Sequence, residues 1–373
     1  MIKVFIITPW FAPAFRAGGP VQSLVNMINQ YNENISYHII CGNKDVDGTV
    51  LSNIAIDQWV KYNDNTSVWY TSKWNTLSSI RSLMKENAPD VLYIVGIYSL
   101  KFNIIPLLFS KAPKKILSVR GMMHPGALSQ KKWKKKLYLS LLNLLNIQKN
   151  IFFHVTDEIE EQYVKYQMGI TARIIIAGNF PNKLITSAPL QKNAHSLSMV
   201  SIALISPMKN YLLVLKSLQY SSAHIEYHIC GAIKDHSYWE ECLQQIKQLP
   251  SNINVVYHGE VEPTEMTPFL ERSHIAILPS KSENFGHSIY EALSVGKPVI
   301  TSFGTPWLNL KHHHAGLNVN PETNELQNAI EFFANMNNED YQQWVLGAGE
   351  FAAKAIDREK LKQEYDEMWG SVV

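Results

Sequence analysis

The chain has 373 residues, of which 46% are apolar and 18% are charged, and its formal net charge is only +2. A chain of this length usually forms more than one hydrophobic core, so we expect two domains. The composition excludes a disordered protein, and the small net charge excludes polyanion binding by the molecule as a whole.

Cysteine spacing and the N-terminal run bear on the cellular compartment. Cys41, Cys230 and Cys242 are too widely spaced for a disulfide framework or a thiolate metal site, which indicates a reducing compartment. The run MIKVFIITPW is too short for a signal peptide, and no segment reaches the roughly 18 uninterrupted apolar residues of a membrane span. We therefore expect a cytoplasmic protein.

Short apolar runs alternate with helical patterns through the first half of the chain, which predicts a parallel sheet with crossover helices. The expected strands are residues 3–8, 37–41, 91–95, 115–119, 151–156 and 173–176, and the expected helices include 21–31, 77–87 and 131–147.

The alternation stops in the polar stretch 178–197 and then begins again, which indicates a linker between two domains of the same class. The expected strands of the second half are residues 199–205, 226–230, 254–257 and 274–278, with helices at 210–219 and 237–248. We place the domains at residues 1–185 and 186–355. A C-terminal helix within 356–373, with one apolar stripe at Leu361, Tyr365 and Trp369, is expected to pack back on the first domain.

The stretch LPSKSENFGHSIYEALSVGKPVITSFGTPW, residues 278–307, is the most informative part of the chain. A loop follows a strand and enters a helix, and Gly286 removes side-chain bulk at the turn. The backbone N–H groups at such a helix start, with the positive end of the helix dipole, favour a diphosphate. Gly286, His287 and Ser288 are the predicted diphosphate-binding residues, and Phe285 beside them is also predicted to bind the donor.

Two glutamates flank this turn, with Glu283 in the loop and Glu291 in the helix. Carboxylates accept hydrogen bonds from paired hydroxyl groups. We therefore predict that Glu291 binds the ribose of a nucleotide and that Glu283 addresses a sugar beyond the phosphates.

This stretch resembles the donor-site signature of the group 1 family of retaining glycosyltransferases, in which two glutamates stand eight residues apart. The motifs SENFG, EAL and GKPVI also match it. The resemblance implies a GT-B fold, which is an α/β architecture of two Rossmann-like parallel-sheet domains facing each other across a cleft. It also implies a nucleotide-sugar donor, reaction on the donor's front face, and no enzyme nucleophile.

Three other segments extend the resemblance over most of the chain. The loop TPWFAPAFRAGGP ends in Gly18 and Gly19, which open a helix and allow close approach of a phosphate or acceptor. The turn SPMKN carries Lys209 at a helix start, where an ammonium group adds to the helix dipole. The segment RGMMHPGAL resembles one found in bacterial polysaccharide-assembly members.

Two positions depart from the family pattern. Leu204 stands where many members have an arginine that shares the diphosphate charge, so Lys209 acts with helix dipoles alone or with another basic residue. Arg120 stands where many members have a histidine that contacts the donor sugar, and His124 follows four residues later. We predict that Arg120 faces the site, with His124 as the alternative.

The sequence predicts neither a metal site nor a cofactor. Asp45 and Asp47 form a DxD pattern in a polar loop beside Gly48, which is typical of a turn, and the adjacent histidines 312–314 cannot easily converge on one ion. The basic helix 129–147 carries five lysines around Trp133, followed by leucines on one face. It either places these leucines in the core or lies on an anionic membrane surface.

Three functions remain at this point. The first is transfer of a sugar from a UDP or GDP donor to a growing glycan or lipid-linked acceptor in cell-surface polysaccharide or lipopolysaccharide synthesis, at the inner face of the membrane. The second is a nucleotide-sugar epimerase of the same architecture, in which Glu283 and His124 serve as acid and base. The third is a non-catalytic protein that binds a membrane surface. The absence of basic and aromatic residues interleaved elsewhere argues against nucleic acid.

Overall fold

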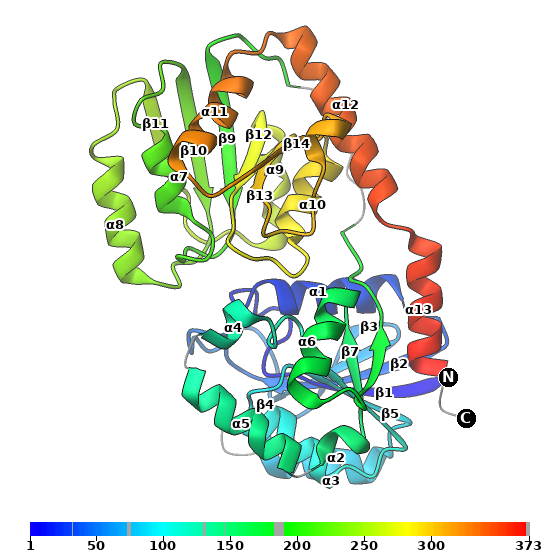
Figure 1. Ribbon diagram of the computed structural model, residues 1–373. Coiled ribbons are helices and arrows are strands. Elements are labelled where there is room, and N and C mark those ends of the chain that lie inside the picture. Colours follow the sequence, from blue (N-terminus) through cyan, green and yellow to red (C-terminus); the bar gives the residue numbers. More distant parts are fainter. Residues whose placement is uncertain (32, 73–75, 130–131, 145, 183–189, 371–373) are drawn as a thin grey trace. The chain divides into compact units, whose positions relative to one another are not determined.

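The computed structural model describes residues 1–31, 33–72, 76–129, 132–144, 146–182 and 190–370 (Figure 1). The chain divides into two compact units. Unit 1 consists of residues 1–180 and 357–373, and unit 2 consists of residues 181–356. The expected domain boundary at residues 185 and 186 lies outside the described residues.

Unit 1 contains an eight-stranded sheet in the order β3-β4-β2-β1-β5-β6-β7-β8. All neighbouring strands are parallel except β3 and β4, which form an antiparallel pair at one edge. The strands are β1 (Ile2–Ile7), β2 (Ile35–Gly42), β3 (Trp59–Asn63), β4 (Thr66–Thr71), β5 (Val91–Val95), β6 (Lys114–Ser118), β7 (Phe152–Val155) and β8 (Arg173–Ile176).

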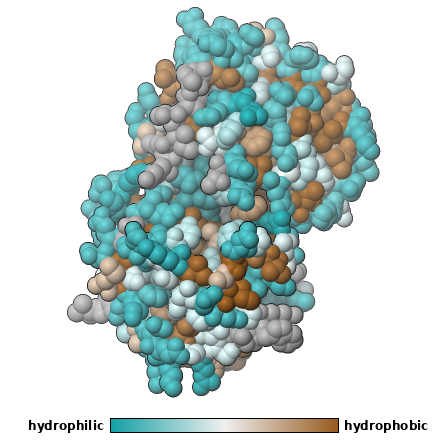
Figure 2. Space-filling model, turned by 180° about the vertical axis from the view of Figure 1, so that it is seen from behind, coloured by the Kyte–Doolittle hydropathy of each residue, from teal (hydrophilic) through white to brown (hydrophobic). Residues whose placement is uncertain are grey.

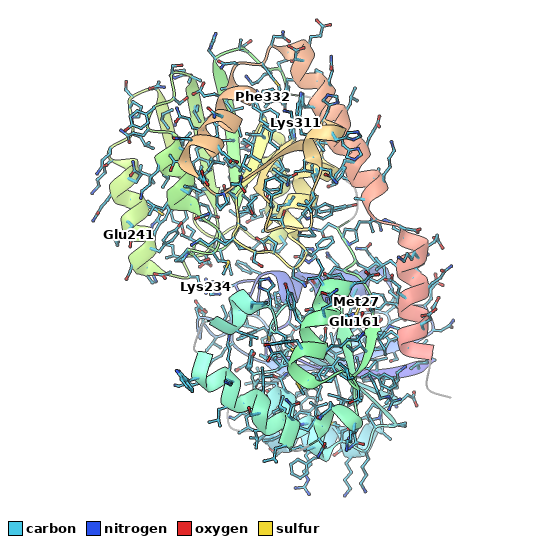
Figure 3. All side chains as sticks on the ribbon, in the orientation of Figure 1. Met27, Glu161, Lys234, Glu241, Lys311 and Phe332 are labelled. Atoms are coloured by element: carbon cyan, nitrogen blue, oxygen red, sulfur yellow. The ribbon has the colours of Figure 1, made fainter. Side chains whose placement is uncertain are left out.

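The helices of unit 1 are mostly crossover connections, as the alternating pattern predicts. They are α1 (Gly19–Gln30), α2 (Thr76–Asn87), a π-helical turn η1 (Leu100–Ile104) that continues into α3 (Ile105–Phe109), α4 (Pro125–Ser129), α5 (Lys132–Leu144), η2 (Ile147–Lys149) and α6 (Glu158–Met168). Met27 of α1, labelled in Figure 3, is fully buried and shows the core side of that helix.

The C-terminal helix α13 (Arg358–Gly370) belongs to unit 1. Its predicted stripe of Leu361, Tyr365 and Trp369 is buried, and the Trp369 ring lies 5.4 Å from the Tyr93 ring of the central strand β5. Lys114 Nζ at the start of β6 donates to the Met368 carbonyl at 2.7 Å. Helix α13 is therefore part of the core of unit 1 in the described residues.

Unit 2 contains a six-stranded, all-parallel sheet in the order β11-β10-β9-β12-β13-β14. The strands are β9 (Ser196–Ile202), β10 (His224–Cys230), β11 (Ile253–Tyr257), β12 (Ile275–Leu278), β13 (Val299–Ser302) and β14 (Gly316–Val319). The helices are α7 (Tyr211–Ser217), α8 (His236–Ile246), η3 (Pro263–Glu265), α9 (Thr267–Glu271), α10 (His287–Ser294), η4 (Leu310–His313), α11 (Thr323–Ala334) and α12 (Asn338–Ala355).

The sheet of unit 2 is covered on both faces. Successive residues of β9 point to opposite sides, and Met199 belongs to a core with α7, α8 and α11, whereas Val200 belongs to a core with α9, α10 and α12. Phe332, labelled in Figure 3, packs against Trp344 at 5.2 Å between ring centroids and joins α11 to α12. This is the doubly wound arrangement that near-continuous apolar strands require.

The basic helix is α5, and its expected apolar face points outward. Trp133, Leu137, Leu141 and Leu144 are all exposed, whereas Leu139 and Leu142 are the side chains that enter the core. The alternative that places the spaced leucines in the core is therefore wrong for these residues. Figure 2 shows apolar patches on a molecular face that is mainly hydrophilic.

Candidate functional site

The strand order of unit 2 defines where a ligand is expected to bind. From β9 the chain moves outward to β10 and β11, and then crosses to the other side of β9 to form β12, β13 and β14. The loops after β9 and β12 therefore leave the sheet in opposite directions, which opens a crevice at the carboxyl ends of these two strands. Lys209 follows β9 and Glu283 follows β12.

Lys209 and Glu283 meet at this switch point. Lys209 Nζ forms a hydrogen-bonded ion pair with Glu283 Oε1, although the two residues are 74 positions apart in the chain. The side chains are 20% and 11% exposed, so the pair is largely screened from solvent yet still open to it. The charges that the sequence assigned to one donor site are thus in direct contact.

The backbone around this pair is fixed by hydrogen bonds between loops. The Glu283 amide donates to the Gly304 carbonyl at 2.9 Å, the Lys281 amide donates to the Met208 carbonyl at 2.9 Å, and Asn210 Nδ2 donates to the Pro279 carbonyl at 3.2 Å. These bonds join the loops after β9, β12 and β13. The backbone that carries Lys209 and Glu283 is therefore held in place by these bonds.

The turn into α10 has the geometry that the sequence predicts for Gly286. Gly286 has φ 76° and is the residue that precedes the helix. A Cβ atom at this position would lie 3.1 Å from Ile289 Cδ1 and 3.3 Å from Trp307 Nε1, so both conformation and space favour glycine. Trp307 Nε1 donates to the Phe285 carbonyl at 2.5 Å and holds the turn in place.

His287 and Ser288 are the first two residues of α10, so their backbone N–H groups lie at the positive end of the helix dipole. Both side chains are half-buried. The Phe285 ring lies 4.7 Å from the His287 ring and 5.4 Å from the Trp307 ring. This aromatic cluster supports a helix start that presents its positive end at the same edge of the sheet as Glu283.

Glu291 lies on the second turn of α10. Its carboxylate accepts a hydrogen bond from Asn182 Nδ2, and burial raises its pKa to about 7, an effect that the Asn182 bond partly offsets. A carboxyl group with such a pKa changes its charge near neutral pH. Asn182 is a site residue that sequence reasoning missed, because it lies in the polar stretch interpreted as a linker.

Leu204, which the sequence resemblance singled out as a departure, is half-buried in the loop after β9. The backbone amides of two lysines form hydrogen bonds with this loop. The Lys281 amide bonds to Met208, and the Lys234 amide, in the loop after β10, donates to the Ile205 carbonyl at 3.0 Å (Figure 3 labels Lys234). Both side chains are exposed, so each is a candidate for the additional basic residue that the sequence left unidentified.

In unit 1 the switch point lies between β1 and β5, and the loop after β1 leads to α1. Gly18 has φ 71° and ψ −136°, a conformation that side chains rarely adopt, and it precedes the helix. Gly19 is exposed, and nothing lies within 4 Å of a Cβ atom placed there. Pro20 follows at a first-turn position that tolerates proline.

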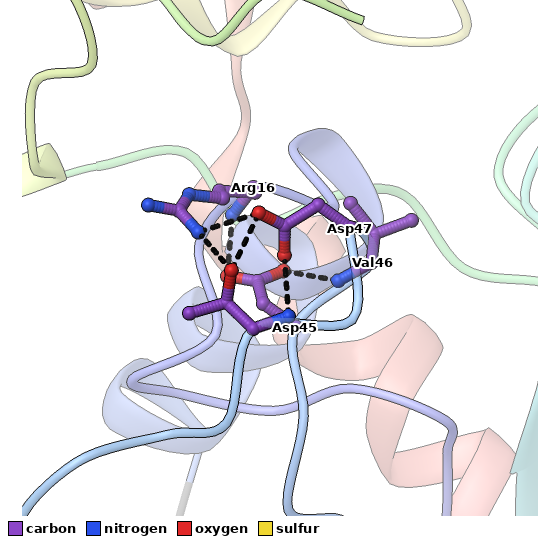
Figure 4. A network of polar contacts seen from close by, with 5 residues as sticks. Arg16, Asp45, Val46 and Asp47 are labelled. Carbon is purple, nitrogen blue, oxygen red and sulfur yellow. Dashed lines mark hydrogen bonds and ion pairs between the residues drawn. The ribbon is translucent and has the colours of Figure 1, made fainter.

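Arg16 links this loop to the DxD segment (Figure 4). Arg16 Nη1 lies 2.7 Å from Asp47 Oδ2 and 2.8 Å from Thr49 Oγ1, and the Arg16 amide donates to Asp45 Oδ2 at 3.1 Å. The Gly48 amide donates to the Asp45 carbonyl at 3.0 Å, which closes the predicted turn. The two aspartates therefore fix the glycine loop through Arg16.

Arg120 points into the interior of unit 1. Its side chain is buried, Nη2 donates to Tyr93 Oη at 3.1 Å, and Nη1 donates to the Asn179 side chain. This network explains why a guanidinium group is tolerated there. The expected contact between Arg120 and the donor stays a prediction, and these bonds give the residue a structural role.

His124 occupies the loop after β6 and is half-buried. Its Nδ1 accepts a hydrogen bond from the Gly126 amide at 3.0 Å, and its ring packs edge-on against Tyr163 at 5.1 Å. Nδ1 is therefore an acceptor, which leaves the proton on Nε2 in the neutral ring. Its role as the alternative to Arg120 also stays a prediction.

Within the described ranges, no group of three or more histidine, cysteine, aspartate or glutamate side chains is arranged to hold a metal ion. Among the helices of the same ranges, none is both long and apolar enough to cross a membrane.

Comparisons with known proteins agree with this arrangement. Residues 182–348 match the model of a family described as Glycosyl transferases group 1. The matched range includes Lys209, Glu283 and Glu291. No match is found among the curated proteins.

Several solved structures are similar over the whole chain. Anabaena Alr3699/HepE, in complex with UDP and glucose, has a TM-score of 0.74 and 15% identity, with 100% of each chain covered. Sucrose-phosphate synthase from Thermosynechococcus elongatus has a TM-score of 0.73 and 13% identity, with 100% of this chain and 99% of the other covered. These similarities establish the GT-B fold, with its two parallel-sheet α/β domains.

Proposed function

We propose that the chain is a retaining glycosyltransferase of group 1 that uses a nucleotide-diphosphate sugar, with UDP or GDP as the nucleotide. The observation that carries the proposal is the Lys209–Glu283 pair at the switch point of unit 2, beside the helix start that precedes Glu291. The family match over residues 182–348 and the UDP bound to the similar HepE structure support it.

The charges of this site suit departure of a diphosphate. Lys209 and the first turn of α10 stabilise negative charge that develops on the leaving phosphate oxygen. In the proposed reaction the bond from the anomeric carbon to this oxygen breaks, and the acceptor oxygen forms a new bond on the same face of the sugar. The acceptor proton moves to the departing diphosphate. Glu283 orients the sugar hydroxyls, and Glu291 binds the ribose.

We further propose that no metal ion and no cofactor take part. Lys209 supplies a cation and α10 supplies oriented N–H groups, which together meet the charge of a diphosphate. Nucleotide binding and transfer are therefore expected to persist at full strength in excess chelator. A rate that depends on added Mg²⁺ would contradict this part of the proposal.

The acceptor in the proposal is a growing or lipid-linked glycan of cell-surface polysaccharide synthesis, including lipopolysaccharide. The protein then works in the cytoplasm and makes peripheral contact with the inner face of the membrane. The basic residues of α5 support this placement. Transfer to a lipid-linked acceptor in vesicles is the corresponding assay.

Calorimetric titration of UDP, GDP and their common sugar conjugates into the wild type and into Glu291→Ala tests the donor site. One nucleotide is expected to bind the wild type, and the substitution is expected to weaken it at least tenfold through loss of a charge-assisted hydrogen bond. Binding that ignores Glu291, or no binding at all, would overturn the proposal.

The epimerase alternative is separated by its products. A transferase releases free nucleotide only in proportion to glycosylated acceptor, whereas an epimerase converts one nucleotide sugar into another and keeps the diphosphate linkage intact. Chromatography of the nucleotides with and without acceptor distinguishes the two reactions.

A further inference from the structure

Charge is distributed very unevenly along unit 1. Residues 91–156 contain 11 lysines and arginines and no aspartate or glutamate. Since the whole chain has 34 basic and 32 acidic side chains, the other residues carry 23 and 32, a formal net charge of −9. The near-neutral net charge of the whole chain is therefore the sum of one strongly basic segment and an otherwise acidic sequence.

Helix α5 lies in this segment and carries an apolar stripe that faces solvent. At 100° per residue, Trp133, Leu137, Leu141 and Leu144 fall within about 80° of arc. Their exposed fractions are 84%, 75%, 51% and 76%. Lys134 and Lys136, both exposed, flank the stripe on its two sides, while Leu139 and Leu142 anchor the helix in the core on the opposite face.

A second element of the segment adjoins α5. Tyr138 Oη of α5 donates to the Ile97 carbonyl, and Lys135 Nζ lies 5.0 Å from the centre of the Tyr98 ring. Ile97 and Tyr98 lead directly into η1 and α3, where Leu100, Leu108 and Phe109 are 62%, 48% and 71% exposed. Seven of the large apolar side chains exposed in the described residues thus lie on α5 and on the continuous turn and helix η1–α3, all within the acid-free segment.

We infer that these elements form a docking surface for an anionic lipid bilayer. The docking surface consists of the seven apolar side chains with the lysines that flank them: Leu100, Leu108, Phe109, Trp133, Leu137, Leu141, Leu144, Lys134 and Lys136. Apolar side chains enter the boundary between headgroups and acyl chains, and the lysines meet the negative headgroups. The inference rests on the proposed function for its purpose, which is access to a lipid-linked acceptor, and it extends the contact beyond the basic helix to η1 and α3.

The combination of charge and apolar exposure selects a bilayer over the alternatives. A nucleic-acid backbone is bound by lysine and arginine side chains and uses no leucine stripe. A bilayer surface uses both kinds of group, and it accepts a one-sided arrangement in which acidic residues are absent.

Sedimentation with vesicles tests the docking surface. We expect the wild type to bind phosphatidylcholine vesicles that contain about one third phosphatidylglycerol, and to bind pure phosphatidylcholine vesicles far more weakly. Leu137→Glu/Leu141→Glu is expected to lower the partition coefficient at least tenfold. Lys134→Gln/Lys136→Gln is expected to lower it about fivefold per lysine. Phe109→Glu, in the second element, is expected to lower it as well.

Leu346→Glu on α12 is the matched control, because Leu346 is 68% exposed but lies outside the acid-free segment. It is expected to leave vesicle binding unchanged. Calorimetric nucleotide binding, measured on each variant without vesicles, reports folding and the donor site separately from membrane contact.

Three results would overturn the inference. The first is a wild type that does not bind phosphatidylglycerol vesicles. The second is a Leu137→Glu/Leu141→Glu variant that binds them as well as the wild type does. The third is displacement from vesicles by duplex DNA with no sensitivity to the leucine substitutions, which would assign the lysines to a polyanion. A failure to bind nucleotide in the same experiments would overturn the proposed transferase and leave the docking surface standing.

Discussion

The two units place a charged loop at the same topological position but use it differently. In unit 2, Lys209 after the first strand reaches across the switch point to Glu283. In unit 1, Arg16 after the first strand pairs with Asp47 in the loop of the neighbouring strand β2, on the side away from the switch point. One topology therefore places an ion pair across the switch point in unit 2 and beside a glycine loop, away from the switch point, in unit 1.

Replacing Glu283 provides the largest test of this asymmetry. Glu283→Gln keeps the size of the side chain but removes the charge that Glu283 is proposed to direct at the donor sugar. We expect the rate of transfer to fall by about two to three orders of magnitude, the loss typical of a preorganised polar group in an active site. Calorimetric nucleotide affinity is expected to stay the same or rise, because Lys209 no longer has a competing partner.

Glu350→Gln is the matched control for this substitution. Glu350 pairs with Lys354 at 3.2 Å on the exposed surface of α12. The substitution therefore removes an ion pair of unit 2 that lies outside the site. Exposed pairs of this kind contribute little, and transfer is expected to be unchanged. Equal losses in the two variants would show that charge removal in unit 2 acts through stability and not through the site.

Lys209→Met tests the other half of the pair. The substitution keeps an unbranched side chain, removes the cation, and leaves Glu283 facing the diphosphate without its partner. We expect UDP affinity to fall by about one to two orders of magnitude, from the loss of a charge-assisted contact. Calorimetry measures this change, and Lys209→Arg, which keeps the charge, is expected to restore most of it. An unaffected affinity in Lys209→Met contradicts the assignment.

The pH dependence of donor binding sharpens the assignment of Glu291. Burial raises the pKa of this carboxyl group to about 7, so the folded protein holds the proton more tightly than the unfolded chain does. Its contribution to stability therefore declines as the pH rises from about 4.5 through 7. Ribose hydroxyl groups bind the ionised carboxylate more strongly than the protonated form. Donor affinity is therefore expected to increase as the pH rises through the same range.

UDP-glucose is the suitable ligand for this measurement because its diphosphate carries no group that titrates near neutral pH. We expect its affinity to be about tenfold higher at pH 8 than at pH 6 for a site with a pKa near 7. Glu291→Gln is expected to remove this slope. A slope that survives in the variant would assign the pH dependence to a group other than Glu291.

The glycine loop of unit 1 offers a test of backbone geometry with a built-in control. Gly18 has positive φ, whereas Gly19 is in the helix and has free space around its Cβ position. Gly18→Ala is expected to destabilise the protein by about 1 kcal/mol or more, and Gly19→Ala is expected to be neutral or slightly stabilising. Thermal unfolding measures both. Equal effects at the two positions would show that the left-handed conformation of Gly18 is not required.

Much of the fold follows from the sequence, and the exceptions have physical reasons. The runs at 91–95 and 173–176 coincide with β5 and β8, and the other expected strands differ from the structure by a few residues at their ends. The antiparallel pair β3 and β4, of which β3 is the edge strand, was missed because Trp59–Asn63 and Thr66–Thr71 mix polar and apolar residues. The exposed stripe of α5 was ambiguous, because a spaced set of leucines has the same period whether it faces the core or solvent.

The residues of the candidate site could be named from the sequence, but the contacts between them could not. A helix start next to a glycine turn is a local feature, and the sequence placed Gly286 and Glu291 on it. The Lys209–Glu283 pair depends on β9 lying beside β12, which no spacing along the chain reveals. The bond from Asn182 to Glu291 likewise joins residues 109 positions apart.

The smallest predicted effect concerns the basic residue that compensates for Leu204. Lys281 is exposed, its amide bonds to the loop that carries Lys209, and it stands two residues before Glu283. We expect Lys281→Ala to weaken UDP affinity about two- to fivefold, the range for a solvent-exposed cation near a diphosphate. The effect should shrink at high ionic strength, since exposed charges are screened within about 10 Å at 0.1 M salt.

Lys311→Ala provides the control, because Lys311 is an exposed lysine of the same unit in η4. It is labelled in Figure 3 and is expected to leave affinity unchanged. The same measurement on Lys234→Ala decides between the two candidate lysines. If neither Lys281→Ala nor Lys234→Ala weakens binding, Lys209 and the dipole of α10 are sufficient for the diphosphate. The difference between the two units then rests on the Lys209–Glu283 pair alone, which lies across the switch point of unit 2.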